Sequence, residues 1–104
     1  MTKTRFALAS ALALLISGNA TAADEAAGKT RFESCLGCHG VSSYNNVYPT
    51  YRVPKIAGQH AMYIESSLKA YRDGSRIHPT MAAQAGTLSD TEIADIAAYL
   101  QSLR

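Results

Sequence analysis

The run Cys-Leu-Gly-Cys-His at residues 35–39 constrains this chain more than any other feature. Two thiols three residues apart on one helical turn can each form a thioether with one of the two vinyl groups of a haem. The next residue, His39, then lies under the iron and can ligate it through an imidazole nitrogen. The motif predicts one haem c, attached covalently through Cys35 and Cys38.

Two other readings of the motif are weaker. A redox disulfide of the thioredoxin type needs a βαβ context, and the pattern around Cys35 and Cys38 is mostly helical. A structural zinc site needs four ligands. Besides the motif itself, the sequence offers only two distant histidines, His60 and His78.

The N-terminus has the order of a secretory signal peptide. Lys3 and Arg5 precede an uncharged run at residues 6–16, and Ala20-Thr21-Ala22 is a small-x-small cleavage signature. A helix of that length spans about 16 Å, short of a hydrocarbon core of about 30 Å, which disfavours a membrane anchor. We expect cleavage after Ala22, with Ala23 as the alternative, and export to the periplasm of a Gram-negative cell.

Composition then describes a small domain, residues 23–104. Without Lys3 and Arg5, the ten Lys and Arg residues fall to eight and balance the eight Asp and Glu residues, so no electrostatic nucleic-acid binder is indicated. Removing 22 of the 104 residues leaves 82, with no Trp and one Phe. A domain of this size has a marginal apolar core, so we expect the haem to fill its centre.

Helical periodicity and capping signals predict three helices, at residues 24–38, at 59–73 and from 89 onward. Asp24 can cap the first helix, and Gly74 can end the second. Ser89 and Glu92 form a capping box at the start of the third. The sequence predicts no strand.

Residues 40–58 are expected to form a loop, since they are rich in turn-forming Ser, Asn and Pro. Three tyrosines are interleaved there, Tyr44, Tyr48 and Tyr51. We expect them to cover haem edges and to hydrogen-bond through their hydroxyls.

The second iron ligand has four candidates, of which Met81 is favoured. It lies in the run Ile-His-Pro-Thr-Met-Ala at residues 77–82, expected to be irregular and able to present a thioether to the far haem face. Met62 is about 200° around its helix from the apolar stripe at Ile64. His60 and His78 stay as further candidates.

Four blocks of this sequence resemble class I cytochromes c, and more narrowly the bacterial c4 and c553 group. They are residues 35–40, residues 53–59 (Val-Pro-Lys-Ile-Ala-Gly-Gln), Met81, and residues 88–93 continued by Tyr99 and Leu100. The resemblance implies an all-α fold in which three main helices and their loops wrap around one covalent haem. Proteins named c4 carry two such domains, whereas this chain has one.

The resemblance also implies roles for individual residues. Pro54 would accept a hydrogen bond from the outer imidazole N–H of His39, which fixes the tautomer. Ile56 would pack on the haem. The first and third helices would cross through Gly28, Phe32, Ile96 and Tyr99.

Ligation by His39 and Met81 closes both axial positions of the iron, so the sequence predicts an electron carrier rather than an enzyme. Its partners would be redox proteins, a dehydrogenase as donor and an oxidase or reductase as acceptor. One alternative is a dedicated haem subunit of an oxidoreductase. Another is a five-coordinate gas-binding or peroxidatic protein. Four basic residues are candidates to neutralise the propionates: Arg52, Lys55, Arg72 and Arg76.

Overall fold

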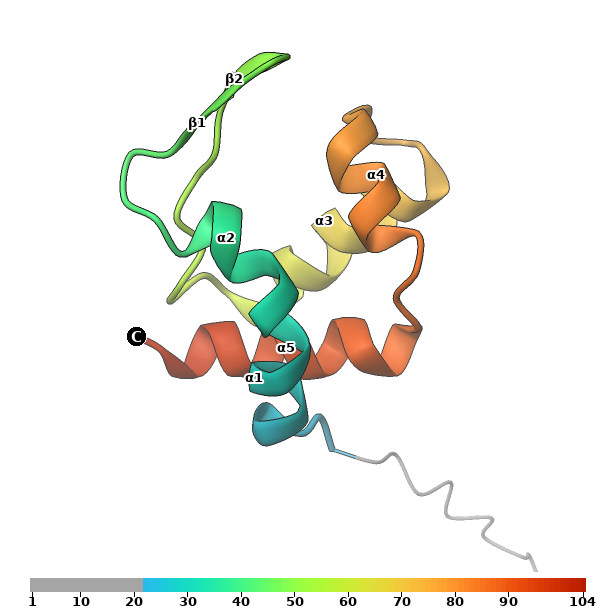
Figure 1. The fold of residues 1–104 in the computed structure, drawn as a ribbon. Coiled ribbons are helices and arrows are strands. Elements are labelled where there is room, and N and C mark those ends of the chain that lie inside the picture. Colours follow the sequence, from blue (N-terminus) through green and yellow to red (C-terminus); the bar gives the residue numbers. More distant parts are fainter. Residues whose placement is uncertain (1–21) are drawn as a thin grey trace, which may run out of the picture.

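A computed structural model describes residues 22–104. The expected signal peptide, residues 1–22, lies outside this part except for Ala22. In chain order the elements are α1 (Glu25–Phe32), a 3₁₀ turn η1 (Glu33–Cys35), α2 (Leu36–His39), β1 (Asn45–Val47), β2 (Thr50–Arg52), α3 (Ala61–Asp73), α4 (Pro79–Ala85) and α5 (Asp90–Ser102) (Figure 1). Within residues 22–104, no helix has both the length and the apolar character needed to span a bilayer.

The first predicted helix is present, but in three pieces. Asp24 caps α1, and its carboxylate accepts hydrogen bonds from the backbone N–H groups of Ala26 and Ala27 at 2.9 and 3.1 Å. The 3₁₀ turn at Glu33–Cys35 then separates α1 from α2, which carries the end of the Cys-x-x-Cys-His motif. The motif therefore sits on two short turns rather than at the end of one long helix.

The first and last helices cross at Gly28. A Cβ built on this glycine would lie only 1.9 Å from the carbonyl oxygen of Asp95 in α5, so the backbones touch. Four residues later, the Phe32 ring lies 6.0 Å from the Tyr99 ring, with the planes tilted by 54°. The terminal-helix contact implied by the family resemblance is thus present (Figure 1).

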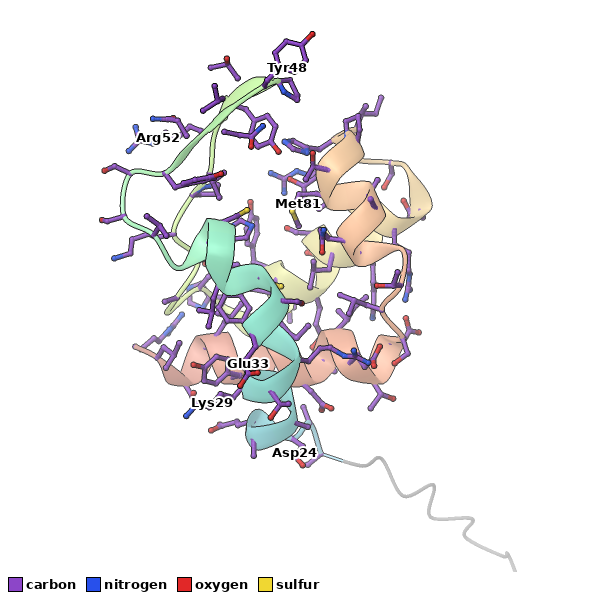
Figure 2. The ribbon with its side chains drawn as sticks, viewed as in Figure 1. Asp24, Lys29, Glu33, Tyr48, Arg52 and Met81 are labelled. Atoms are coloured by element: carbon purple, nitrogen blue, oxygen red, sulfur yellow. The ribbon has the colours of Figure 1, made fainter. Side chains whose placement is uncertain are left out.

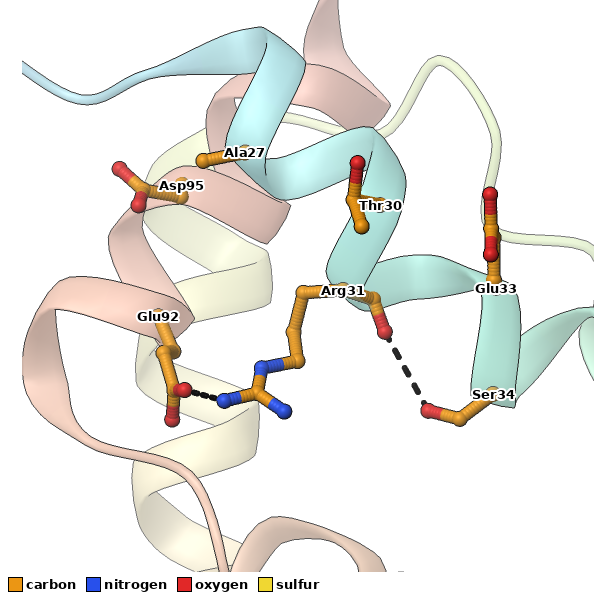
Figure 3. A pocket seen from close by; sticks show the side chains of 7 residues that line it. All are labelled: Ala27, Thr30, Arg31, Glu33, Ser34, Glu92 and Asp95. Carbon is orange, nitrogen blue, oxygen red and sulfur yellow. Dashed lines mark hydrogen bonds and ion pairs between the residues drawn. The ribbon is translucent and has the colours of Figure 1, made fainter.

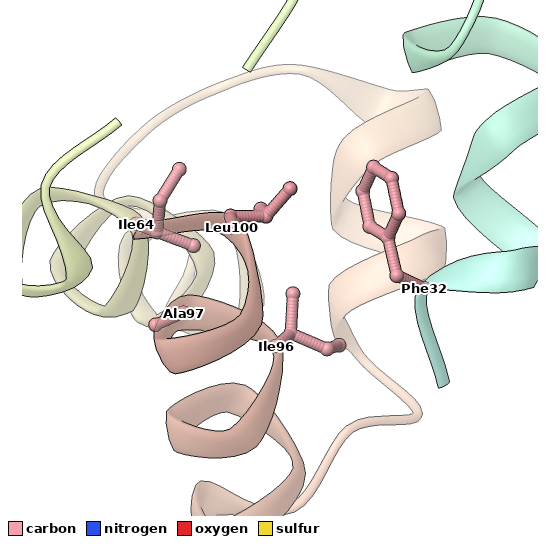
Figure 4. Close-up of a cluster of buried hydrophobic side chains, with 5 residues drawn as sticks. All are labelled: Phe32, Ile64, Ile96, Ala97 and Leu100. Atoms are coloured by element: carbon pink, nitrogen blue, oxygen red, sulfur yellow. The ribbon is translucent and has the colours of Figure 1, made fainter. Parts of the chain in front are cut away.

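The buried hydrophobic cluster lies between α1, α3 and α5. Its members are Phe32, Ile64, Ile96, Ala97 and Leu100, all at most 5% exposed (Figure 4). Two predicted helix boundaries are confirmed. Gly74 ends α3 with φ +87°, and Ser89 and Glu92 form the capping box that starts α5. α5 packs against both α1 and α3.

A small hairpin corrects the expectation that residues 40–58 hold no strand. β1 and β2 pair antiparallel, with Asn46 opposite Tyr51. Asn46 also donates from its side-chain amide to the carbonyl oxygen of Pro49 at 2.7 Å, inside the turn. The strands are three residues long, too short for alternation of polar and apolar residues to reveal them.

A short helix corrects the expectation of an irregular segment at residues 77–82. Pro79 occupies the first turn of α4, where its missing N–H costs no hydrogen bond. His78 caps the helix, since its Nδ1 accepts a hydrogen bond from the Met81 N–H at 3.3 Å. Three alanines follow at positions 82, 83 and 85, and alanine has the highest helix propensity. Met81 therefore lies on a helix that packs against α3, not in a loop.

Candidate haem site

The two cysteines of the motif lie in different surroundings. Cys35, at the end of η1, is half-buried and packs against the hydrophobic cluster. Cys38, in α2, is exposed. Both are free thiols, and they are separated by one helical turn, the spacing needed to bond two vinyl groups on one porphyrin edge.

Burial raises the pKa of the Cys35 thiol above its usual value, and the neighbouring Cys38 adds to this. A hydrogen bond between Cys35 and Ser34 acts in the opposite direction but is the weaker influence. The Cys35 thiol therefore stays protonated at neutral pH. The unmodified thiol of Cys35 is thus held in its neutral form by the apolar surroundings of the cluster.

His39 ends α2, and its ring is held by the chain that follows the hairpin. Its Nδ1 lies 2.8 Å from the carbonyl oxygen of Pro54. A carbonyl can only accept, so Nδ1 must carry a hydrogen, and in the neutral ring Nε2 then keeps its lone pair. This is the hydrogen bond that the resemblance implied, and it fixes the tautomer in which Nε2 can ligate a metal.

Met81 lies on α4 and is half-buried. Figure 2 shows its side chain on the side of α4 that faces α2. In Figure 1, α2 and the hairpin stand on one side of the molecule and α4 stands opposite them, with α5 across the base. The His39 imidazole and the Met81 thioether thus come from elements on opposite sides of this arrangement.

The other candidate ligands have different surroundings. Met62 is 82% exposed on the outer face of α3, as its position relative to Ile64 predicted. His60 contacts the guanidinium of Arg104 near the C-terminus. His78 uses Nδ1 to cap α4.

Ile56 and the tyrosines of residues 40–58 lie in different surroundings. Ile56 is half-buried against the hydrophobic cluster. Tyr51 donates its hydroxyl to Thr80 Oγ1 of α4 at 3.0 Å, whereas Tyr48 is 95% exposed at the hairpin turn (Figure 2).

The basic residues divide into two groups. Arg72 donates to Asp90 Oδ1 at 2.6 Å and to the Leu88 carbonyl at 2.9 Å, and Arg76 stacks over Tyr71 at 4.7 Å. Both guanidinium groups are therefore engaged by the protein. Arg52 and Lys55 are exposed and line a hollow of about 300 Å³ next to Pro54, so they remain candidates to face propionates.

The residues present fit a haem c better than a bare metal ion. Within residues 22–104, no three His, Cys, Asp or Glu side chains gather closely enough to hold an ion. Two thiols, an imidazole with a free Nε2 and a thioether are instead the donors that covalent haem uses.

A larger hollow, of about 620 Å³, lies elsewhere, between α1 and α5. It is lined mainly by polar residues, among them the ion pair between Arg31 and Glu92 (Figure 3). None of the motif residues nor Met81 borders it.

Sequence reasoning named Tyr51 and His78 in other roles and did not single out Thr80, so it missed that these three residues organise α4. The signal for His78 was available, since a polar residue before proline is typical of a helix start. The contact between Tyr51 and α4 carries no local signal, because the two segments are 29 residues apart.

Comparison with known proteins agrees with these features. The family model described as cytochrome c matches residues 25–104. Cytochrome c-554(548) of Halomonas halodenitrificans is 46% identical over 84 residues, covering 78% of this chain and 98% of that protein. The thiosulfate dehydrogenase electron acceptor of Stutzerimonas stutzeri is 32% identical over 102 residues, covering 92% of this chain and 46% of that protein.

Among solved structures, the crystal structure of reduced recombinant cytochrome c4 from Pseudomonas stutzeri matches with a TM-score of 0.58 and 28% identity. The match covers 79% of this chain and 50% of that one. The chain thus spans nearly the whole of one relative and about half of the other two.

Proposed function

Because the chain belongs to the cytochrome c family, we propose that it is a periplasmic carrier of single electrons whose iron is ligated by His39 and Met81. The family cofactor is haem c, and Cys35 and Cys38 are the two cysteines of this chain, at the required spacing. When bound, the haem supplies an iron that changes by one electron between ferric and ferrous.

The observation that carries the proposal is the placement of an imidazole and a thioether on two elements that face each other (Figure 2). The Pro54 carbonyl fixes the His39 ring with Nε2 available, and α4 presents Met81 from the other side. With both residues as ligands, the iron would have no open position for a substrate or a gas, which favours outer-sphere electron transfer over catalysis. A thioether ligand also raises the reduction potential.

The region around Cys38 suits a brief encounter with a redox partner. Leu36 lies within the motif and Val41 two residues after it, and each is 47% exposed. Redox encounters bury little surface, under about 1,200 Å². The balanced charge of residues 23–104 leads us to expect a modest dependence of docking on salt.

The test replaces Met81 and uses an exposed methionine as the control. In M81A, we expect the ferric protein to lose the sulfur-to-iron charge-transfer band and the ferrous protein to bind carbon monoxide. The potential should fall by on the order of 0.1 V, part of the roughly 0.8 V that axial ligands span. M62A should behave like the wild type, because Met62 is 82% exposed. An M81A spectrum identical to that of the wild type would remove Met81 as a ligand.

A dedicated haem subunit is the second candidate function. The relative from Stutzerimonas stutzeri is described as an electron acceptor of thiosulfate dehydrogenase, which supports a dehydrogenase as donor. Purification of the tagged protein from its native periplasm separates the two functions. A free carrier elutes alone at the size of one small domain, whereas a subunit elutes with a larger enzyme.

A further inference from the structure

His78 stands at the centre of a set of contacts that the electron-transfer function does not account for. Its Nδ1 accepts the hydrogen bond of the Met81 N–H at 3.3 Å, and its carbonyl accepts that of Ala82 at 2.8 Å. An N–H can only donate, so Nδ1 is the unprotonated nitrogen of the ring. The side chain thus holds the backbone of Met81 itself, three residues along the chain.

The ring of His78 is in turn held by two tyrosines from different elements. The Tyr51 ring of β2 meets it edge to face at a centroid distance of 4.7 Å, and the Tyr71 ring of α3 lies 6.1 Å away at 77°. Tyr51 also reaches past it and donates to Thr80 Oγ1 at 3.0 Å. The hairpin, α3 and the first turn of α4 therefore meet at one imidazole.

We propose that His78 is a positioning residue, which fixes α4 so that Met81 faces the iron. This inference rests on the proposed function, in which Met81 is the second ligand. Asn, Asp or Ser caps a helix as well as His does, but none has a ring that two tyrosines can hold. The imidazole combines the capping acceptor with an aromatic surface, so it orients the helix as well as starting it.

The need for such a residue follows from how little else holds α4. Among its seven residues only Ala85 is buried. A helix this short is not stable alone, so its first turn depends on the cap and on tertiary contacts. Loosening the cap should let Met81 leave the iron more often without unfolding the protein.

Imidazole added to the ferric holoprotein measures that event, because it binds the iron only when Met81 has left. We expect H78A to bind imidazole about two- to tenfold more tightly than the wild type, in line with the usual effect of losing a helix cap. Hydrogen exchange of the Met81 amide should accelerate by a similar factor. H78N keeps an acceptor for this amide and should restore its protection, with an imidazole affinity between those of H78A and the wild type.

The matched control is S89A, which removes the cap of a helix that carries no proposed ligand. Ser89 Oγ accepts from the Glu92 N–H at 3.2 Å, the same capping geometry on α5. S89A should lower the melting temperature and expose the Glu92 amide, yet leave imidazole affinity at the wild-type value. If S89A raised imidazole affinity as much as H78A does, His78 would have only a general effect on stability.

A second pair of variants keeps the test decisive if H78A yields no holoprotein. Y51F keeps the ring beside His78, and Y51A removes it. We expect Y51A to bind imidazole more tightly than Y51F, and equal affinities would overturn the proposal. The charge-transfer band of the wild type distinguishes a failure of the ligation by Met81 from a failure of the role of His78. Its absence would overturn the ligation by Met81 together with this inference, whereas a band with unchanged imidazole affinity in H78A would overturn only the role of His78.

Discussion

Gly28 sets how closely α1 approaches α5. A methyl group there would lie 1.9 Å from the Asp95 carbonyl oxygen and 2.9 Å from the Ile96 nitrogen, both backbone atoms that cannot move alone. We expect G28A to separate the helices and to lower the free energy of unfolding by about 3 kcal/mol, the upper part of the usual range for overpacking. Denaturant unfolding of the holoprotein measures this. K29A, on the exposed side of α1, should change stability by less than about 0.5 kcal/mol.

The carboxyl group of Asp90 makes the stability of the protein depend on pH in the acidic range. The hydrogen bond and charge of Arg72 hold the pKa of this carboxyl below its usual range. Its stabilising effect is therefore complete above the unfolded pKa of about 3.9 and is lost as the pH falls through the lower folded value. We expect D90N to be slightly less stable than the wild type at pH 7, with melting temperatures that converge near pH 2.

The control for this carboxyl is E65Q, which breaks an exposed pair with Lys69 at 3.7 Å. Exposed pairs of this kind contribute little, so E65Q should leave the pH profile almost unchanged. A D90N difference that persisted at pH 2 would mean that packing, not charge, is responsible.

At the scale of elements, α5 is the helix against which α1 and α3 pack. Leu100 is fully buried in the cluster between them, while Leu103, three residues later, is 45% exposed. We expect L100A to lower the free energy of unfolding by about 3 kcal/mol through lost contacts and a residual cavity. L103A should cost less than about 0.5 kcal/mol. Chemical denaturation of the two variants side by side tests this, and similar losses would contradict the packing described.

The elements that the sequence predicted are those with strong local signals. α5 has its capping box at Ser89 and Glu92, and α3 has its stop at Gly74, so both were found. The hairpin was missed because its strands are only three residues long. α4 was missed although its cap is a local signal, and the hydrogen bond that ties it to the hairpin joins residues distant in sequence. Tyr51 and Thr80, 29 residues apart, illustrate this, since neither residue signals the other locally.

The site divides in the same way. The motif residues were predicted from their spacing. Met81 was favoured as a ligand because residues 77–82 were expected to be irregular, whereas it lies on α4. The hydrogen bond between His39 and Pro54 was expected only from the family resemblance, because the residues are 15 positions apart and spacing alone does not bring them together. The role of His78 as a cap was not predicted, although its place directly before Pro79 is typical of a helix start.

At the scale of the whole molecule, few side chains of the chain are buried. Within residues 22–104 the buried hydrophobic residues are Phe32, Val53, Ile64, Ala85, Ile93, Ile96, Ala97 and Leu100. So small a core leaves a domain of this size marginal without a further stabilising group. We expect the double variant C35A/C38A, which cannot attach haem covalently, to show much reduced helical circular dichroism. A cooperative thermal transition in that variant would contradict this.

The segment that carries His39 and the helix that carries Met81 differ in how many of their side chains are buried. Before His39, the side chains of Phe32 and Cys35 pack in the hydrophobic cluster. In α4, which carries Met81, only Ala85 is buried. On warming, α4 with Met81 should therefore detach first, while α2 with His39 stays in place. Between the native holoprotein and the unfolded chain we expect a partly unfolded state. In this state the helices would be intact and one face of the porphyrin would be open to small molecules.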